Sequence, residues 1–157
     1  MKRKLLIAAA ALLVLVLIGI AVYAFTHPRA PSNDFQIRSV VYGFGDEVGQ
    51  VSLATTTEGV SAVLDRHYAL YVHPDLLASW KAAPLTAPSR QTLGTWPDHI
   101  DIQTVTKNDN DTYTVDASVM PRERESVPAT QGTLVRFTLG QGLDGWQITA
   151  YETGTAP

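Results

Sequence analysis

The chain has 157 residues, of which 45% are hydrophobic, so it is long enough for one domain with its own core. It contains no cysteine, which excludes disulfides, a thiolate nucleophile and lipidation of a cysteine. After position 25 the chain carries nine basic and fifteen acidic residues, a net charge of −6. That charge argues against binding to nucleic acid and to anionic lipid headgroups.

The first element is an uncharged run of 21 residues, 5–25, with the sequence LLIAAAALLVLVLIGIAVYAF. As a helix it would span about 31 Å, which matches the hydrocarbon core of a bilayer. Lys2, Arg3 and Lys4 precede it, and the positive-inside rule keeps such a basic tail, residues 1–4, in the cytoplasm. The sequence therefore predicts a single-pass cell-membrane protein, with the membrane as a partner through residues 5–25 and the rest extracytoplasmic.

A cleavable signal peptide is the alternative interpretation of the same run. Val22 and Ala24 are small residues at its end and could satisfy a cleavage enzyme. The apolar region of a signal peptide usually has about 7–15 residues, and the greater length here favours the anchor. If the segment is cleaved, the protein is secreted, and in both cases the domain works outside the cytoplasm.

Residues 26–33, THPRAPSN, read as a short stiff linker with two prolines, and the domain is expected over 34–153, with 154–157 as a tail. A first helix follows, capped by Ser32 or Asn33. Gly43, Gly45 and Gly49 each weaken it by nearly 1 kcal/mol relative to alanine, so packing has to hold it. Its apolar stripe has spacings of four and three residues: Ile37, Val41, Phe44, Val48 and Val51.

A second helix is predicted in TTTEGVSAVLDRHYALY, with Thr55 and Glu58 as a capping box. The step from His73 to Pro74 ends this helix, because the residue before proline disfavours the helical region, and Pro74 suits the first position of a short third helix. The second helix presents on one face Val60, Val63, Leu64, His67, Tyr68 and Tyr71, and the third presents Leu76, Leu77 and Trp80.

Residues 82–98, AAPLTAPSRQTLGTWPD, contain too many prolines and glycines for a regular element. Long loops of this kind are disproportionately functional. Beyond them, alternating segments predict four consecutive strands, HIDIQTV, TYTVDASVM, TLVRFTL and WQITAYE, joined by turns such as the solvated NDND. The prediction is an α+β domain in which helices cover one face of a curved antiparallel sheet.

A spaced series of residues resembles a group of membrane-anchored or secreted proteins of Gram-positive bacteria with an NTF2-like, or cystatin-like, fold. The resemblance covers roughly residues 44–120, and the chain departs from it at Ser89, where we expect glycine, and at Gly94 and Thr95. It implies a cone-shaped fold and no established activity. The residues that carry it are Phe44–Gly45, Val51–Leu53, Tyr68, Tyr71–Val72, Pro74, Leu76–Leu77, Trp80, Pro84, Ala87–Pro88, Arg90, Trp96–Pro97 and Ile100.

The sequence offers no convincing catalytic set, and neither a metal nor a cofactor is expected. His67 and Asp65 are two residues apart, about 200° around a helix, so they do not face each other. Asp98 and His99 adjoin on a strand, where neighbouring side chains point to opposite faces. The four histidines, at 27, 67, 73 and 99, lack the tight spacings of a zinc site.

Two functional hypotheses follow. The first is a non-enzymatic protein-interaction or assembly module, binding a protein partner or itself. The second is a small-ligand-binding protein or an enzyme of the dehydratase or isomerase type, with a pocket between the helices and the sheet. Its candidate ligand-binding residues are His67, Tyr71, Trp80, Trp96 and Asp98. If Tyr68, Tyr71 and Trp80 fill the space between helices and sheet, the pocket hypothesis fails.

Overall fold

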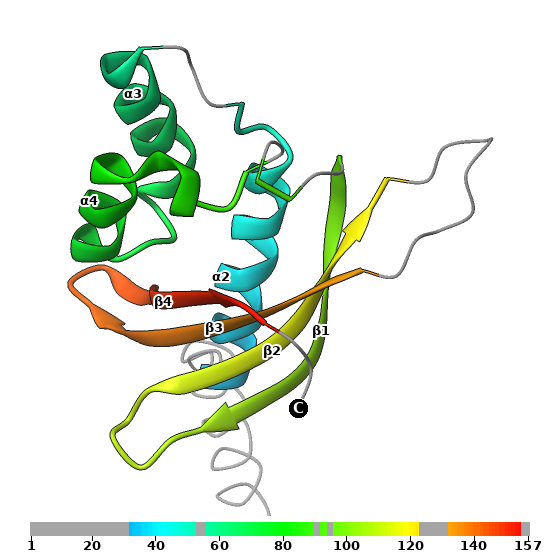
Figure 1. The fold of residues 1–157 in the computed structure, drawn as a ribbon. Helices are drawn as coiled ribbons and strands as arrows, with labels where there is room; N and C mark the ends of the chain where they lie inside the picture. Colours follow the sequence, from blue (N-terminus) through cyan, green and yellow to red (C-terminus); the bar gives the residue numbers. More distant parts are fainter. Residues whose placement is uncertain (1–31, 53–55, 90–91, 94–95, 123–131, 155–157) are drawn as a thin grey trace, which may run out of the picture. The chain divides into compact units, whose positions relative to one another are not determined.

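The structure is a computed structural model that describes residues 32–52, 56–89, 92–93, 96–122 and 132–154. It has the predicted α+β architecture (Figure 1), with helices α2 (Asn33–Val48), α3 (Thr57–Tyr68) and α4 (Pro74–Ala82), and a 3-10 turn η1 (Pro84–Thr86). The strands are β1 (Pro97–Lys107), β2 (Tyr113–Pro121), β3 (Thr133–Gly142) and β4 (Gly145–Thr153). Among these residues no helix is long and apolar enough to span a membrane, and the anchor predicted at 5–25 lies outside them.

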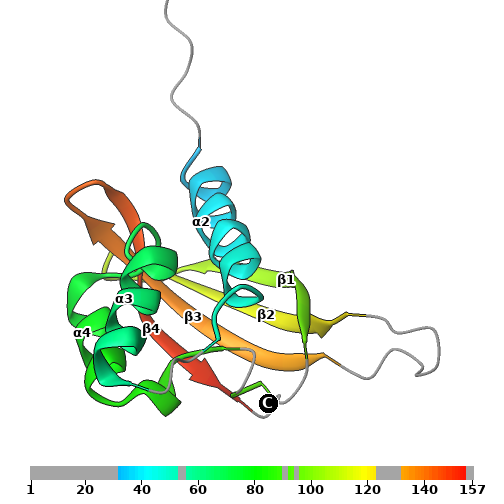
Figure 2. The ribbon, with the colours of Figure 1, turned by 90° about the horizontal axis from the view of Figure 1, so that it is seen from above.

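The four strands form one open antiparallel sheet in the order β1-β2-β3-β4, which confirms the predicted meander. The three described α-helices lie on one face of it (Figure 2). That face carries the buried side chains, including Val115, Ala117, Phe137 and Leu139, whereas Thr104 and Arg136 on the other face are exposed. The sheet thus buries one face and leaves the other polar, as expected of a sheet packed on one side.

Bulges interrupt the strict alternation of the sequence. In β1 the register shifts between Ile102 and Thr104, so the next residue to face inward is Val105 rather than Thr104. The pairing of β3 with β4 shifts in the same way between Thr138 and Leu139. Each bulge places one extra residue in a strand, bends the strand and increases its local twist.

Helix α2 begins at Asn33, within the predicted cap region, but it ends at Val48 rather than continuing to Val51. Val51 is fully buried in the turn that follows, where its N–H donates to the carbonyl of Val48 at 3.3 Å. Close packing explains why residues 43 and 45 are glycine. A Cβ at Gly43 would lie 2.6 Å from Tyr71 Cε1, and one at Gly45 would lie 2.8 Å from an Ile100 side-chain carbon.

The start of α3 differs by one residue from the prediction. The N-cap is Thr56, whose hydroxyl accepts from the Gly59 N–H at 3.2 Å, and not Thr55. A run of three threonines offers equivalent caps, and the helix register selects the one that sends Val60 and Leu64 into the core. The helix also ends at Tyr68, so Tyr71 lies in the turn beyond it rather than on the helical face.

Candidate functional site

The space between helices and sheet is filled by five aromatic rings. Phe44 of α2 lies at its centre, with ring centroids 4.9 Å from Tyr68, 5.8 Å from Phe137 and 6.3 Å from Trp80. Tyr151 of β4 completes the cluster at 6.0 Å from Trp80 and 5.5 Å from Phe137. Phe44, Tyr68 and Phe137 are fully buried and Trp80 is 3% exposed, so a core occupies the place where the second hypothesis puts a pocket.

The joint between α3 and α4 anchors this cluster to the sheet. His73 caps α4, since its Nδ1 accepts from the Asp75 N–H at 3.4 Å, and Pro74 takes the first helical position as predicted. The preceding residues run alongside β4, where the Ile148 N–H donates to the Tyr71 carbonyl at 2.8 Å and the His73 N–H donates to the Ile148 carbonyl at 2.9 Å. The joint is therefore both a helix cap and a short extension of the sheet.

His67 is half-buried and hydrogen-bonded, but its partner is not near it in the sequence. Its Nδ1 lies 2.6 Å from Glu47 Oε2 on α2, with side-chain exposures of 21% and 33%. Asp65 instead pairs with Lys81 of α4 at 2.5 Å. The prediction that Asp65 and His67 do not face each other is confirmed, and the His67–Glu47 pair ties α3 to α2.

Asp98 and His99 lie together, which corrects the prediction that they point to opposite faces. The pairing of β1 with β2 shifts between Pro97 and His99, and this bulge lets His99 Nδ1 approach Asp98 Oδ2 at 3.1 Å. Arg122 Nε is 3.5 Å from the other carboxylate oxygen. The hydrogen bond from His99, and then that from Arg122, lower the pKa of Asp98 below its ordinary value, although all three side chains are largely exposed.

The five predicted ligand-binding residues thus have separate environments. Trp80 is in the core, Tyr71 packs against Gly43, and His67 pairs with a carboxylate. Trp96 is 41% exposed and Asp98 lies at the exposed start of β1. None of the five lines the described pocket, which sequence reasoning missed.

That pocket has a volume of about 200 Å³ and lies between the proline-rich loop and the end of β4. The loop contributes apolar walls from Leu85, Ala87, Pro88 and Leu93. The other lining residues are Thr86, Thr92, Tyr151 and Thr153, whose side chains each carry a hydroxyl group. No charged side chain lines it among the described residues, and the only sequence signal for it was the length of the loop.

The loop wall is held in place by a local network. Thr92 Oγ1 donates to the Ala87 carbonyl at 3.0 Å and accepts from the Ser89 N–H at 2.8 Å. The Tyr68 hydroxyl reaches from the core and donates to the Pro88 carbonyl. Burial raises the pKa of Tyr68, and also that of Tyr151, so both phenols stay protonated donors. The Tyr151 hydroxyl is enclosed and has no hydrogen-bond partner in the described part of the chain.

The uncovered face of the sheet carries an ordered polar row. Asp116 of β2 accepts from Arg136 Nε at 2.7 Å and from Thr104 Oγ1 at 3.1 Å. These residues pair directly across β1, β2 and β3, and Glu152 of β4 continues the row opposite Arg136. The hydrogen bond from Arg136 lowers the pKa of Asp116, and the hydrogen bond from Thr104 lowers it by a smaller amount.

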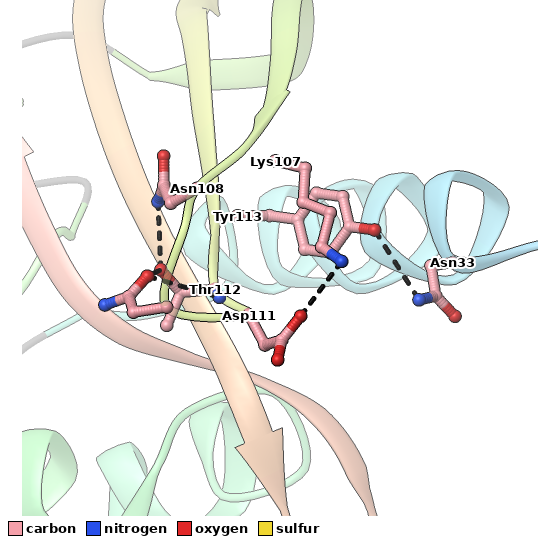
Figure 3. A network of polar contacts seen from close by, with 7 residues as sticks. Asn33, Lys107, Asn108, Asp111, Thr112 and Tyr113 are labelled. Carbon is pink, nitrogen blue, oxygen red and sulfur yellow. Dashed lines mark hydrogen bonds and ion pairs between the residues drawn. The ribbon is translucent and has the colours of Figure 1, made fainter.

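The hairpin between β1 and β2 is the predicted solvated turn (Figure 3). Asn108 donates through Nδ2 to Thr112 Oγ1 at 2.9 Å, and Lys107 pairs with Asp111 at 2.9 Å. Asp111 has a φ of 57°, the left-handed conformation that aspartate tolerates in turns. At the end of the hairpin, the Tyr113 hydroxyl accepts from Asn33 Nδ2 at 3.5 Å, where α2 begins. These contacts explain the polar residues of the hairpin as groups that stabilise the turn.

Among the described residues, no three His, Asp or Glu side chains come together as a metal site would need. The chain was also compared with known proteins. No family model, no curated protein sequence and no solved structure matches it.

Proposed function

We propose that the chain is an NTF2-like extracytoplasmic domain on a single membrane anchor, and that it acts as a non-enzymatic protein-interaction or assembly module in a larger envelope complex. The observation that carries the proposal is the aromatic cluster. Phe44, Tyr68 and Trp80 occupy the space in which an NTF2-like enzyme or carrier would hold its ligand, so the molecule offers its surface rather than its interior.

Topology and assembly are separate parts of the proposal and need separate tests. The native chain lacks cysteine, so a single engineered cysteine gives an unambiguous label. In intact cells, a membrane-impermeant maleimide is expected to label L143C, which is at a fully exposed hairpin tip, and not K2C. Labelling of K2C with protection of L143C would contradict the orientation, and release of an unanchored domain would show cleavage.

Assembly is tested on the full chain in its own membrane. After photo-crosslinking from positions spread over the domain and extraction in mild detergent, the protein is expected in complexes larger than the 17.0 kDa monomer. A photoreactive residue at Thr106 samples the uncovered sheet face, and one at Ser79 samples the exposed side of α4. Recovery of the protein only as a monomer, with no adduct from any position, would refute the interaction module.

The enzyme or small-ligand hypothesis keeps one supporting observation, the His67–Glu47 pair. An imidazole 2.6 Å from a carboxylate is a common acid–base arrangement, and both side chains retain some exposure. The pair lies between two helices, and neither residue lines the described pocket. A structural role predicts that H67Q loses stability and keeps partner adducts, whereas a catalytic role predicts the accumulation of an unprocessed substrate in cells carrying H67Q.

A further inference from the structure

The end of β4 has backbone groups that no described residue satisfies. β4 is an edge strand that is covered at Ile148, because both backbone groups of Ile148 bond to the joint at Tyr71 and His73. Farther along, the Gly154 N–H donates to the Leu134 carbonyl of β3 at 3.2 Å. Since alternate residues of a strand direct their backbone groups to opposite sides, Tyr151 and Thr153 direct theirs away from β3, toward the free edge.

This uncovered edge coincides with the pocket. Tyr151 and Thr153 form one side of it, and the loop carrying Ala87, Pro88 and Leu93 forms the other. An exposed strand edge is a template on which another extended chain can pair. Recognition by added strands combines backbone hydrogen bonds with a pocket for one side chain, and both parts are present here.

The size and chemistry of the pocket indicate its occupant. Sites for whole small molecules usually have about 300–1,000 Å³, and a pocket of about 200 Å³ suits a single side chain. Its walls lack charge among the described residues, so an aliphatic side chain fits and a charged one would be desolvated without a partner. The chain after position 25 carries a net charge of −6, which favours peptides whose flanking residues are neutral or basic.

We propose that the free edge of β4 at Tyr151 and Thr153 binds an extended, neutral-to-basic segment of a partner protein and places one aliphatic side chain in the pocket under Leu85. The segment continues the edge pairing that the joint begins at Ile148. Its backbone pairs with the outward backbone groups of Tyr151 and Thr153. The inference rests on the proposed interaction function and names its site and the class of its ligand.

The test uses the full chain in its own membrane, with a photoreactive residue in place of Leu85, which is 80% exposed on the rim of the pocket. The expected adduct maps by mass spectrometry to one extended segment of a partner. T153P removes an N–H that points away from β3, and L93D puts a charge into the wall; both are expected to lower the yield of the adduct. L143D, at an exposed hairpin tip, is the control and should leave it intact.

The segment identified is then synthesised and titrated into the purified full-length protein. Losing one backbone hydrogen bond, worth about 1 kcal/mol, should weaken binding about fivefold in T153P and when the matching peptide nitrogen is methylated. Circular dichroism of T153P must match the native chain. Binding that is equally tight in T153P and to the methylated peptide overturns the proposed site.

The two proposals fail in different ways. Adducts from Thr106 or Ser79 without one from Leu85 overturn the β4 site and leave the interaction module standing. The same holds for a Leu85 adduct whose yield is unchanged in both T153P and L93D. A protein that gives no adduct from any of the three positions and remains a monomer refutes both proposals.

Discussion

The stability of the W80A variant tests whether Trp80 is part of the core or forms the mouth of a pocket. The indole is 3% exposed and contacts the rings of Phe44, Tyr68 and Tyr151 at centroid distances of 6.3, 5.8 and 6.0 Å. Truncating a buried tryptophan to alanine costs about 3–5 kcal/mol, because burial is lost and a cavity remains. Domains have about 5–15 kcal/mol of stability in total, so this is a large share of it.

The corresponding change in melting temperature follows from the size of the domain. An unfolding entropy of about 2.1 cal/mol/K per residue gives about 0.25 kcal/mol/K for roughly 120 residues. W80A should therefore melt about 12–20 °C lower. The measurement is thermal unfolding of the full-length protein in detergent, followed by circular dichroism because the mutation removes a fluorophore.

W96A is the matched control, since the same substitution is made at a side chain that is 41% exposed. The Trp96 carbonyl accepts the Arg122 N–H at 2.7 Å, and a side-chain substitution leaves that bond in place. We expect W96A to cost less than about 1 kcal/mol. If W80A costs no more than W96A, the aromatic cluster is not the core and the pocket hypothesis returns.

Three further changes test other parts of the structure. G45A should destabilise by about 1–3 kcal/mol in urea unfolding, despite alanine's better helix propensity, because its Cβ would meet Ile100; stabilisation would contradict the packing. T56A should cost about 1 kcal/mol as a lost cap, measured in the same way, and no loss would remove that assignment. NMR titration should place the pKa of Asp116 below its ordinary value of 3.8. The carboxylate therefore contributes stability above pH 3.8, and this contribution is lost as the pH falls through the lowered pKa of the folded state. R136Q should raise the pKa of Asp116, and an unchanged pKa would contradict the ion pair.

Much of the fold could be predicted because local patterns determine it. The stripe from Ile37 to Val48 has a helical period, and the His73–Pro74 step restricts its own backbone, so both features are encoded by near neighbours. The choice of Thr56 over Thr55 was not accessible, because adjacent threonines cap equally well and only tertiary packing selects the register.

The contacts of the site depend on residues that are distant in the sequence. His67 meets Glu47 across 20 positions, and nothing in either local sequence indicates that partner. The pocket brings the loop around Pro88 to Tyr151 of β4, which are likewise far apart in the chain. Sequence reasoning therefore singled out the loop but did not identify Tyr151 and Thr153, which line the pocket with it.

The bulge in β4 explains why both the core and the proposed site depend on Tyr151. Strict alternation in WQITAYE would place Ala150 and Glu152 inward with Ile148, burying a carboxylate and turning Tyr151 to solvent. The register shift opposite Thr138 and Leu139 adds one residue, so Tyr151 follows Ile148 into the cluster while Glu152 is exposed. The same shift directs the backbone groups of Tyr151 to the free edge. A shift of one residue reverses both the face to which a side chain points and the side to which its backbone groups point. One extra residue thus couples the packing of the aromatic cluster to the edge on which we propose that a partner strand binds.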